Sequence, residues 1–98
     1  MPMPYYVSPE QIKDEPITPR TDIYSLGVLL YESLTGRQPF VDSPATELLR
    51  KQLYEPLPAL QERRPDLPPA LDAVIQHATA KDPADRYPTA SSLADDLK

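Results

Sequence analysis

The chain has 98 residues, carries fifteen Asp and Glu against ten Lys and Arg, and contains no cysteine. A chain of this length is one domain at most and buries roughly 60–65% of its unfolded surface, which excludes a two-lobed enzyme of about 250 residues. The acidic balance argues against nucleic-acid and anionic-membrane partners, and the lack of cysteine excludes disulfides and thiolate zinc sites.

The composition predicts an ordered, all-α domain. Fourteen prolines accompany two glycines, and the prolines stand between periodic apolar segments, where they start and stop helices. No apolar run is long enough to span a bilayer, so we expect no membrane insertion. The N-terminus lacks the basic and apolar regions of a signal peptide, and we therefore expect a cytoplasmic location.

The first two helices are marked by their caps. A short helix from about Pro9 to Lys13 follows Ser8, which is placed to cap it. A longer helix is expected over residues 20–35, capped by Thr18-Pro19 or by Thr21. Gly36 is the expected left-handed stop of this second helix.

The helix over residues 20–35 is apolar nearly all the way round. A helix of this kind must be wrapped by other elements in water, so we expect it at the centre of the fold. Gly27 in its interior costs about 1 kcal/mol relative to alanine, which predicts that another element packs closely there. Asp22 lies in its first turn, where a carboxylate interacts well with the helix dipole.

Three further helices are predicted in the C-terminal half. The third begins at Ser43-Pro44 as cap and first position, and residues 55–66 form a proline-rich connection. The fourth follows Pro68-Pro69 and ends near Lys81. The last begins at Thr89, with Leu93 and Leu97 facing inward. The expectation is about five helices packed around the second.

Three short motifs stand out along the chain. They are Ser8-Pro9-Glu10, the segment from Asp22 to Gly27 with Leu34-Thr35-Gly36 and Pro39-Phe40 after it, and the segment from Asp82 to Tyr87. Each is weak alone, but jointly they span nearly the whole chain. The chain resembles the C-terminal part of the large lobe of bacterial serine/threonine kinases of the eukaryotic type. Residues 1–98 are thus expected to form a partial large lobe without the small lobe, catalytic loop or metal-binding loop.

The resemblance implies a structural ion pair between Glu10 and Arg86. In the family, the glutamate of the Ala-Pro-Glu-like motif pairs with the arginine before the last helix. A bidentate carboxylate–guanidinium pair is the usual way to bury two charges. The alternative, from composition alone, is that both are solvated surface charges.

The resemblance also assigns roles near the central helix and the N-terminus. Asp22 and Gly27 are expected to anchor the central helix; in the family the aspartate accepts hydrogen bonds from the catalytic loop. In this chain, Asp22 could instead satisfy the first turn of its own helix. Pro4, Tyr6 and Ser8 resemble a remnant of the substrate-docking segment, although Pro2 and Met3 depart from the glycine and threonine that are usual there.

The residues that phosphoryl transfer needs are missing from the sequence. It contains no glycine-rich phosphate loop, no His-Arg-Asp and no Asp-Phe-Gly. We therefore expect no catalysis, no metal site and no cofactor in this chain alone. An intact parent would use ATP and Mg²⁺ to phosphorylate Ser or Thr of proteins.

Two functions remain open at this stage. The chain is a non-catalytic kinase fragment or relic that serves as scaffold or docking unit, with the helix near residues 43–54 as the best contact. Alternatively, it is a free-standing helical module that binds a protein partner or forms a homodimer through an uncovered face of the central helix. A weaker alternative is an unrelated helical adaptor that has converged on these motifs.

Overall fold

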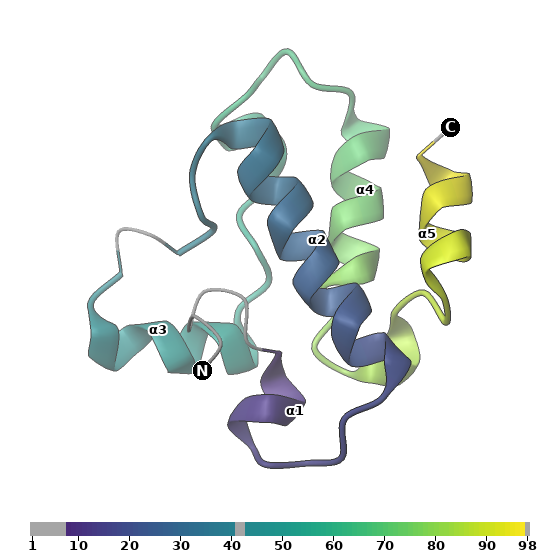
Figure 1. The fold of residues 1–98 in the computed structure, drawn as a ribbon. Helices are drawn as coiled ribbons and strands as arrows, with labels where there is room; N and C mark the ends of the chain where they lie inside the picture. The colour runs from purple at the N-terminus through teal and green to yellow at the C-terminus, as the bar shows by residue number, and fades with distance from the viewer. Residues whose placement is uncertain (1–7, 41–42, 98) are drawn as a thin grey trace.

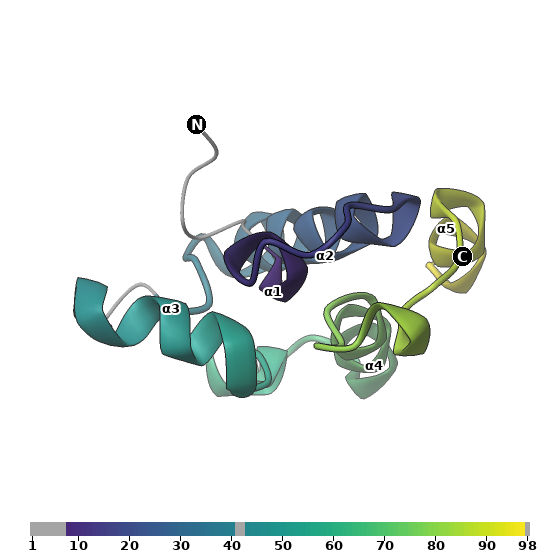
Figure 2. The same ribbon diagram turned by 90° about the horizontal axis from the view of Figure 1, so that it is seen from below.

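The computed structural model describes residues 8–40 and 43–97. Five α-helices and two short 3-10 turns make up its regular structure, and these residues include no strand, so the all-α prediction is confirmed. Figure 1 shows α2 crossing the molecule with α4 alongside it, α5 beyond α4, and α1 and α3 on the opposite side. Figure 2 shows that α3 and α4 lie in a second layer next to α2.

Helices α1 (Pro9–Ile12) and α2 (Pro19–Thr35) both begin with a reciprocal cap. The N–H of Ser8 donates to Gln11 Oε1 over 2.9 Å, and Ser8 Oγ accepts from the Gln11 N–H. Thr18 caps α2 in the same way, and its N–H donates to Thr21 Oγ1 over 3.0 Å. Helix α2 ends at Gly36, whose φ of +75° is the left-handed conformation predicted for it.

The remaining elements follow α2 along the chain, joined by short connections. They are α3 (Ala45–Tyr54), η2 (Leu60–Glu62), α4 (Pro69–Ala78), η3 (Pro83–Asp85) and α5 (Ala90–Asp96). Thr89, where the last helix was predicted to begin, caps α5 by accepting from the Ser92 N–H over 3.1 Å. The 3-10 turn η2 lies within the segment that we expected to be only a connection.

The core surrounds α2. Tyr24, Val28 and Tyr31 pack with buried side chains from α3, from the segments on either side of it and from α4. Ile23 packs with the C-terminal part of α4, with Tyr87 and with Leu93 of α5. The central position of α2 is therefore confirmed. One face stays open, where Leu29 is 48% exposed and Asp22 and Ser33 are also exposed.

Three boundary predictions were wrong. Helix α3 is capped by Pro44, which has no side-chain hydrogen bond to offer, rather than by Ser43. Helix α4 ends at Ala78 rather than near Lys81 because Thr79 leaves the helical conformation, with φ −107° and ψ 20°. Leu97 lies beyond the end of α5 and is exposed, so only Leu93 faces inward.

Candidate functional site

The structure brings Glu10 and Arg86 together across 76 positions of sequence. Glu10 lies in the first turn of α1, which the Ser8 cap holds in place. Arg86 follows η3, a turn that Asp82 caps by accepting from the Ala84 N–H. Arg86 Nη1 lies 2.7 Å from Glu10 Oε2, and Nη2 lies 2.8 Å from Oε1. The pair is thus bidentate, and each residue is 2% exposed.

Every N–H of the Arg86 guanidinium donates a hydrogen bond. Besides the two bonds to Glu10, Nη1 donates to the Arg20 carbonyl over 3.0 Å. Nε donates to the Ala80 carbonyl over 2.7 Å, and Nη2 donates to the Lys81 carbonyl over 3.2 Å. A guanidinium has five N–H groups, so this charge is buried without an unsatisfied donor. Arg86 therefore joins α1, the start of α2 and the loop after α4.

The surroundings favour the ionised form of Glu10. Burial opposes ionisation, but hydrogen bonds from Arg86, from the backbone and from Thr21 outweigh it and lower the pKa of Glu10 to about 2. Thr21 Oγ1 donates to Glu10 Oε2 over 2.8 Å. The guanidinium carbon of Arg86 also lies 4.9 Å from the centre of the Tyr24 ring, and burial raises the pKa of Tyr24.

Asp22 and Gly27 lie on different sides of α2. Gly27 faces α4: a Cβ added there would lie 2.6 Å from Thr79 Cγ2 and 3.0 Å from Ala78 Cβ. The close approach expected at this glycine is therefore present. Asp22 is exposed, and we find no hydrogen bond to its carboxylate within residues 8–40 and 43–97. Thr18, rather than Asp22, satisfies the first turn of α2.

Of the three residues expected to form a docking remnant, Ser8 alone lies in the described part of the chain. Pro4 and Tyr6 lie outside the described residues. Ser8 is buried, and its hydrogen bonds go to Gln11, so its role here is to cap α1.

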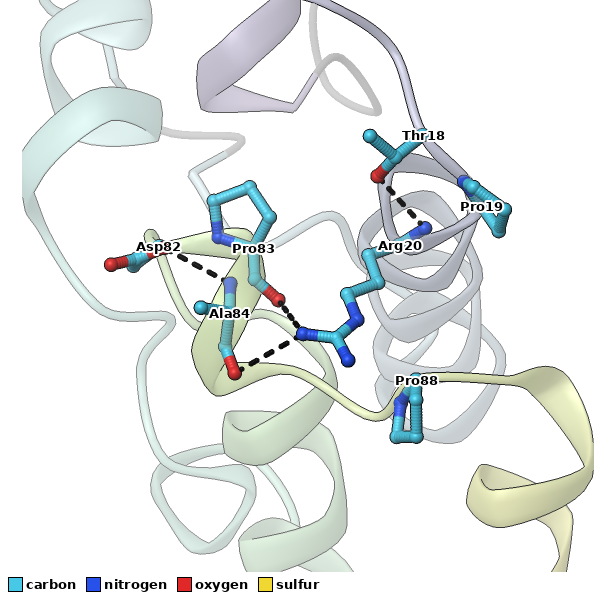
Figure 3. Close-up of a pocket in the computed structure, with 7 residues that line it drawn as sticks. All are labelled: Thr18, Pro19, Arg20, Asp82, Pro83, Ala84 and Pro88. Atoms are coloured by element: carbon cyan, nitrogen blue, oxygen red, sulfur yellow. Dashed lines mark hydrogen bonds between the residues drawn. The ribbon is translucent and has the colours of Figure 1, made fainter.

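A cavity of about 530 Å³ lies where α2 begins (Figure 3). Its walls come from residues 18–20, 82–84 and 88, and include three prolines. Arg20 Nη1 reaches across to donate to the Pro83 and Ala84 carbonyls over 3.4 and 3.3 Å. Because the Asp82 carboxylate is engaged as the cap of η3, the cavity offers no pair of groups for acid–base chemistry. It is an open depression between the start of α2 and η3.

One buried polar cluster was missed by sequence reasoning. Tyr24 of α2 donates to Gln52 Oε1 of α3 over 2.6 Å, and Lys81 Nζ lies 3.3 Å from the same hydroxyl. Lys81 also donates to the Gln52 carbonyl over 2.8 Å. A glutamine amid the apolar positions of α3 was the only signal in the sequence, since the partners lie 28 or more positions away.

The described residues hold neither a candidate metal site nor a helix able to span a membrane. In residues 8–40 and 43–97, no group of three or more His, Asp or Glu side chains could hold a metal ion. Within the same part of the chain, none of the helices has the length and apolar character needed to cross a membrane.

The sequence matches the family described as protein kinase domain over residues 2–97. It is 45% identical over 93 residues to serine/threonine-protein kinase PknB of Mycolicibacterium smegmatis, which covers 94% of this chain and 15% of that protein. Identity to serine/threonine-protein kinase PknL of Mycobacterium tuberculosis is 41% over 93 residues, or 95% of this chain and 23% of the relative. Identity to serine/threonine-protein kinase PrkC of Bacillus subtilis is 40% over 94 residues, or 96% and 14%. The chain therefore spans less than a quarter of each of these relatives.

Proposed function

The chain belongs to the protein kinase domain family, and on that premise we propose that it is a structural and docking part of a serine/threonine kinase large lobe, without catalytic activity of its own. The buried Glu10–Arg86 pair carries this proposal. It ties α1, at the Ser-Pro-Glu motif, to the loop before the last helix, and both sit against the central helix α2. An ion pair of this kind can hold these elements in place, but it does not catalyse a reaction.

The absence of catalysis in this chain is part of the proposal. ATP and Mg²⁺ would be used only by residues outside these 98, and a cytoplasmic location goes with that activity. Titrating the isolated chain with ATP, with and without Mg²⁺, should give no binding heat. Saturable binding of ATP, or phosphate transfer by the isolated chain, would contradict the non-catalytic proposal.

The scaffold role can be tested in a chimera. We would replace the matching segment of the 45%-identical PknB relative with this chain and measure phosphorylation of a short peptide. The chimera should be active, whereas Glu10→Ala and Arg86→Ala should each abolish most of that activity. Asp66→Ala, at an exposed ion pair, is the matched control and should leave it unchanged. Full activity of the Glu10 and Arg86 variants would count against the scaffold role.

Helix α3 is the best candidate for docking. It carries two large exposed side chains, Leu49 and Tyr54, which are 46% and 72% exposed. Solvated apolar and aromatic groups of this size are typical anchors for a protein partner. In the chimera, Leu49→Ala with Tyr54→Ala should reduce phosphorylation of a protein substrate and leave that of a short peptide unchanged. Equal rates on both substrates would argue against docking through α3.

Self-association is the second candidate, and the exposed face of α2 favours it. Leu29 is 48% exposed on the open face of α2, which it shares with exposed Ser33. A homodimer would cover this face. Light scattering at high concentration should then give a dimer mass that Leu29→Ser lowers to that of a monomer. A monomer mass for the unaltered chain would remove this alternative.

A further inference from the structure

The C-terminal end of α3 lacks a hydrogen-bond donor that a regular helix would supply. In an α-helix, the carbonyl of residue 52 accepts from the N–H of residue 56. Residue 56 is a proline, which has no N–H, and Glu55 before it is extended with φ −101° and ψ 134°. The last regular bond of the helix is therefore from the Glu55 N–H to the Lys51 carbonyl, at 2.9 Å.

Lys81 supplies the missing donor from a different part of the chain. Its ammonium lies 2.8 Å from the Gln52 carbonyl oxygen, at the negative end of the helix dipole. The same ammonium lies 3.3 Å from the Tyr24 hydroxyl and over the rings of Tyr24 and Phe40, at 5.4 and 5.8 Å from their centres. One side chain thus contacts the end of α3, the central helix and the turn between them.

The backbone of Lys81 is itself held by the buried ion pair. Arg86 donates to the carbonyls of Ala80 and Lys81, over 2.7 and 3.2 Å. Contacts therefore run without a gap from the Glu10–Arg86 pair through Lys81 to Gln52 of α3. Helix α3 also packs against α1, places Leu48 in the core beside α2 and accepts a hydrogen bond from Tyr24, while Figure 2 shows its far end extending away from α2 and α4.

From this geometry we propose that Lys81 is a positioning residue that caps α3 and fixes its placement relative to α2 and the ion pair. That α3 is the docking helix rests on the function proposed above; the capping itself does not. The consequence is that Lys81 links the docking helix to the Glu10–Arg86 pair, in addition to the Tyr24–Gln52 hydrogen bond and the packing of α1 on α3.

Loss of the ammonium proton of Lys81 does not abolish this role. Burial, and then the neighbouring Arg86 charge, lower the pKa of Lys81 to about 8, while Glu55 acts in the opposite direction. Other charged groups near it come from α1 and the turn after α1, where Lys13 and Glu15 line the same cavity as Lys81 and Asp82. Both the ammonium and the neutral amine carry N–H donors for the Gln52 carbonyl.

The test is site-resolved hydrogen exchange of the full 98-residue chain. Lys81→Met keeps the apolar stem and removes the donor, so the Glu55 amide in the last turn of α3 should exchange at least about tenfold faster, with amides of α2 and α4 changing much less. Lys13→Met, at an exposed lysine on the same cavity, is the control and should change nothing in α3. Unchanged α3 exchange in Lys81→Met, or an equal increase throughout the chain, would overturn the proposal.

A rescue variant distinguishes capping from general stabilisation. Pro56→Ala restores an N–H at position 56, so that α3 can extend and satisfy the Gln52 carbonyl itself. Exchange in Lys81→Met with Pro56→Ala should return toward the rate of Pro56→Ala alone; failure to do so would count against capping. Should Lys81→Met not fold, Lys81→Gln keeps one N–H donor, and its effect should still be confined to α3.

The kinase chimera separates this inference from the docking function. If α3 docks substrates, Lys81→Met should slow phosphorylation of the protein substrate and not of the peptide. Suppose that Lys81→Met raises amide exchange in α3, but the Leu49 and Tyr54 variants do not change substrate choice. This combination would refute docking and leave capping intact. The opposite result would support docking and refute capping.

Discussion

Removing the Glu10 carboxylate is the most direct perturbation of the fold. In Glu10→Ala, the Arg86 guanidinium stays buried, and loses the two hydrogen bonds of 2.7 and 2.8 Å that neutralise it. Thr21 loses its acceptor at the same time. The remaining partners of Arg86 are backbone carbonyls, which accept hydrogen bonds but carry no net charge.

Two lines of reasoning give a similar magnitude. Leaving one partner of a buried ion pair without the other costs about 3–5 kcal/mol. Independently, the lowering of the Glu10 pKa from 4.5 to about 2 corresponds to about 3 kcal/mol in favour of the ionised carboxylate in the folded state. We therefore expect Glu10→Ala to lower the free energy of unfolding by about 3–5 kcal/mol. That is a large share of the 5–15 kcal/mol typical of small domains.

Urea denaturation followed by circular dichroism measures this loss. With an m value of about 1–1.5 kcal/mol/M, a loss of 3 kcal/mol lowers the midpoint by about 2–3 M. Asp66→Ala is the matched control: Arg64 and Asp66 are also 2.7 Å apart, but their side chains are 45% and 62% exposed. Because this pair is exposed to solvent, its removal should leave the urea midpoint nearly unchanged. Equal and near-zero losses in the Glu10 and Asp66 variants would refute the assignment of burial as the cause.

Four further outcomes are expected, each measured by the same urea titration. Because the folded pKa of Glu10 is about 2, its contribution is complete above pH 4.5 and is lost as the pH falls to 2, by about 3 kcal/mol; Glu10→Gln should lack this slope. The folded pKa of Lys81, about 8, lies below its ordinary 10.5, so stability should rise by roughly 1–2 kcal/mol between pH 8 and 10, and Lys81→Met should remove the rise. Gly27→Ala should cost about 1–3 kcal/mol because the added Cβ meets Thr79 Cγ2 at 2.6 Å. Thr79→Ser, which removes that methyl, should restore most of the loss, and a harmless Gly27→Ala would contradict the packing argument. Tyr31→Phe should be neutral or stabilise by up to about 1 kcal/mol, since the buried hydroxyl has no hydrogen-bond partner among the described residues; a loss above 1 kcal/mol would show that it has one in solution.

Local side-chain chemistry explains why most helix starts could be predicted. Ser8, Thr18 and Thr89 each cap the helix that follows by a hydrogen bond within three residues. Gly36 ends α2 because its positive φ suits glycine. These interactions involve neighbours in sequence, so the residue types and their spacing are sufficient evidence. The same reasoning misplaced the end of α4, because no glycine or proline stands where Thr79 leaves the helical conformation.

The candidate site also contains one contact that the sequence could predict and one that it could not. Glu10 and Arg86 could be named because their flanking motifs resemble a known family, and no spacing rule joins positions 76 apart. Lys81 and Gln52 had no such motif. Their contact depends on the tertiary structure, which places the Lys81 amine 2.8 Å from the Gln52 carbonyl near the end of α3, where Pro56 has no N–H to donate.

The sequence by itself determined that this chain is helical, where most of its helices begin, and that α2 had to be the central one. Caps, proline positions and an all-round apolar surface are properties of short segments, and they act before any distant contact forms. Only the tertiary structure decided which buried charges meet, how α3 is held, and which face of α2 stays open. Those outcomes depend on burial. Two opposite charges attract each other more strongly away from water, and a buried charge left without its partner is costly.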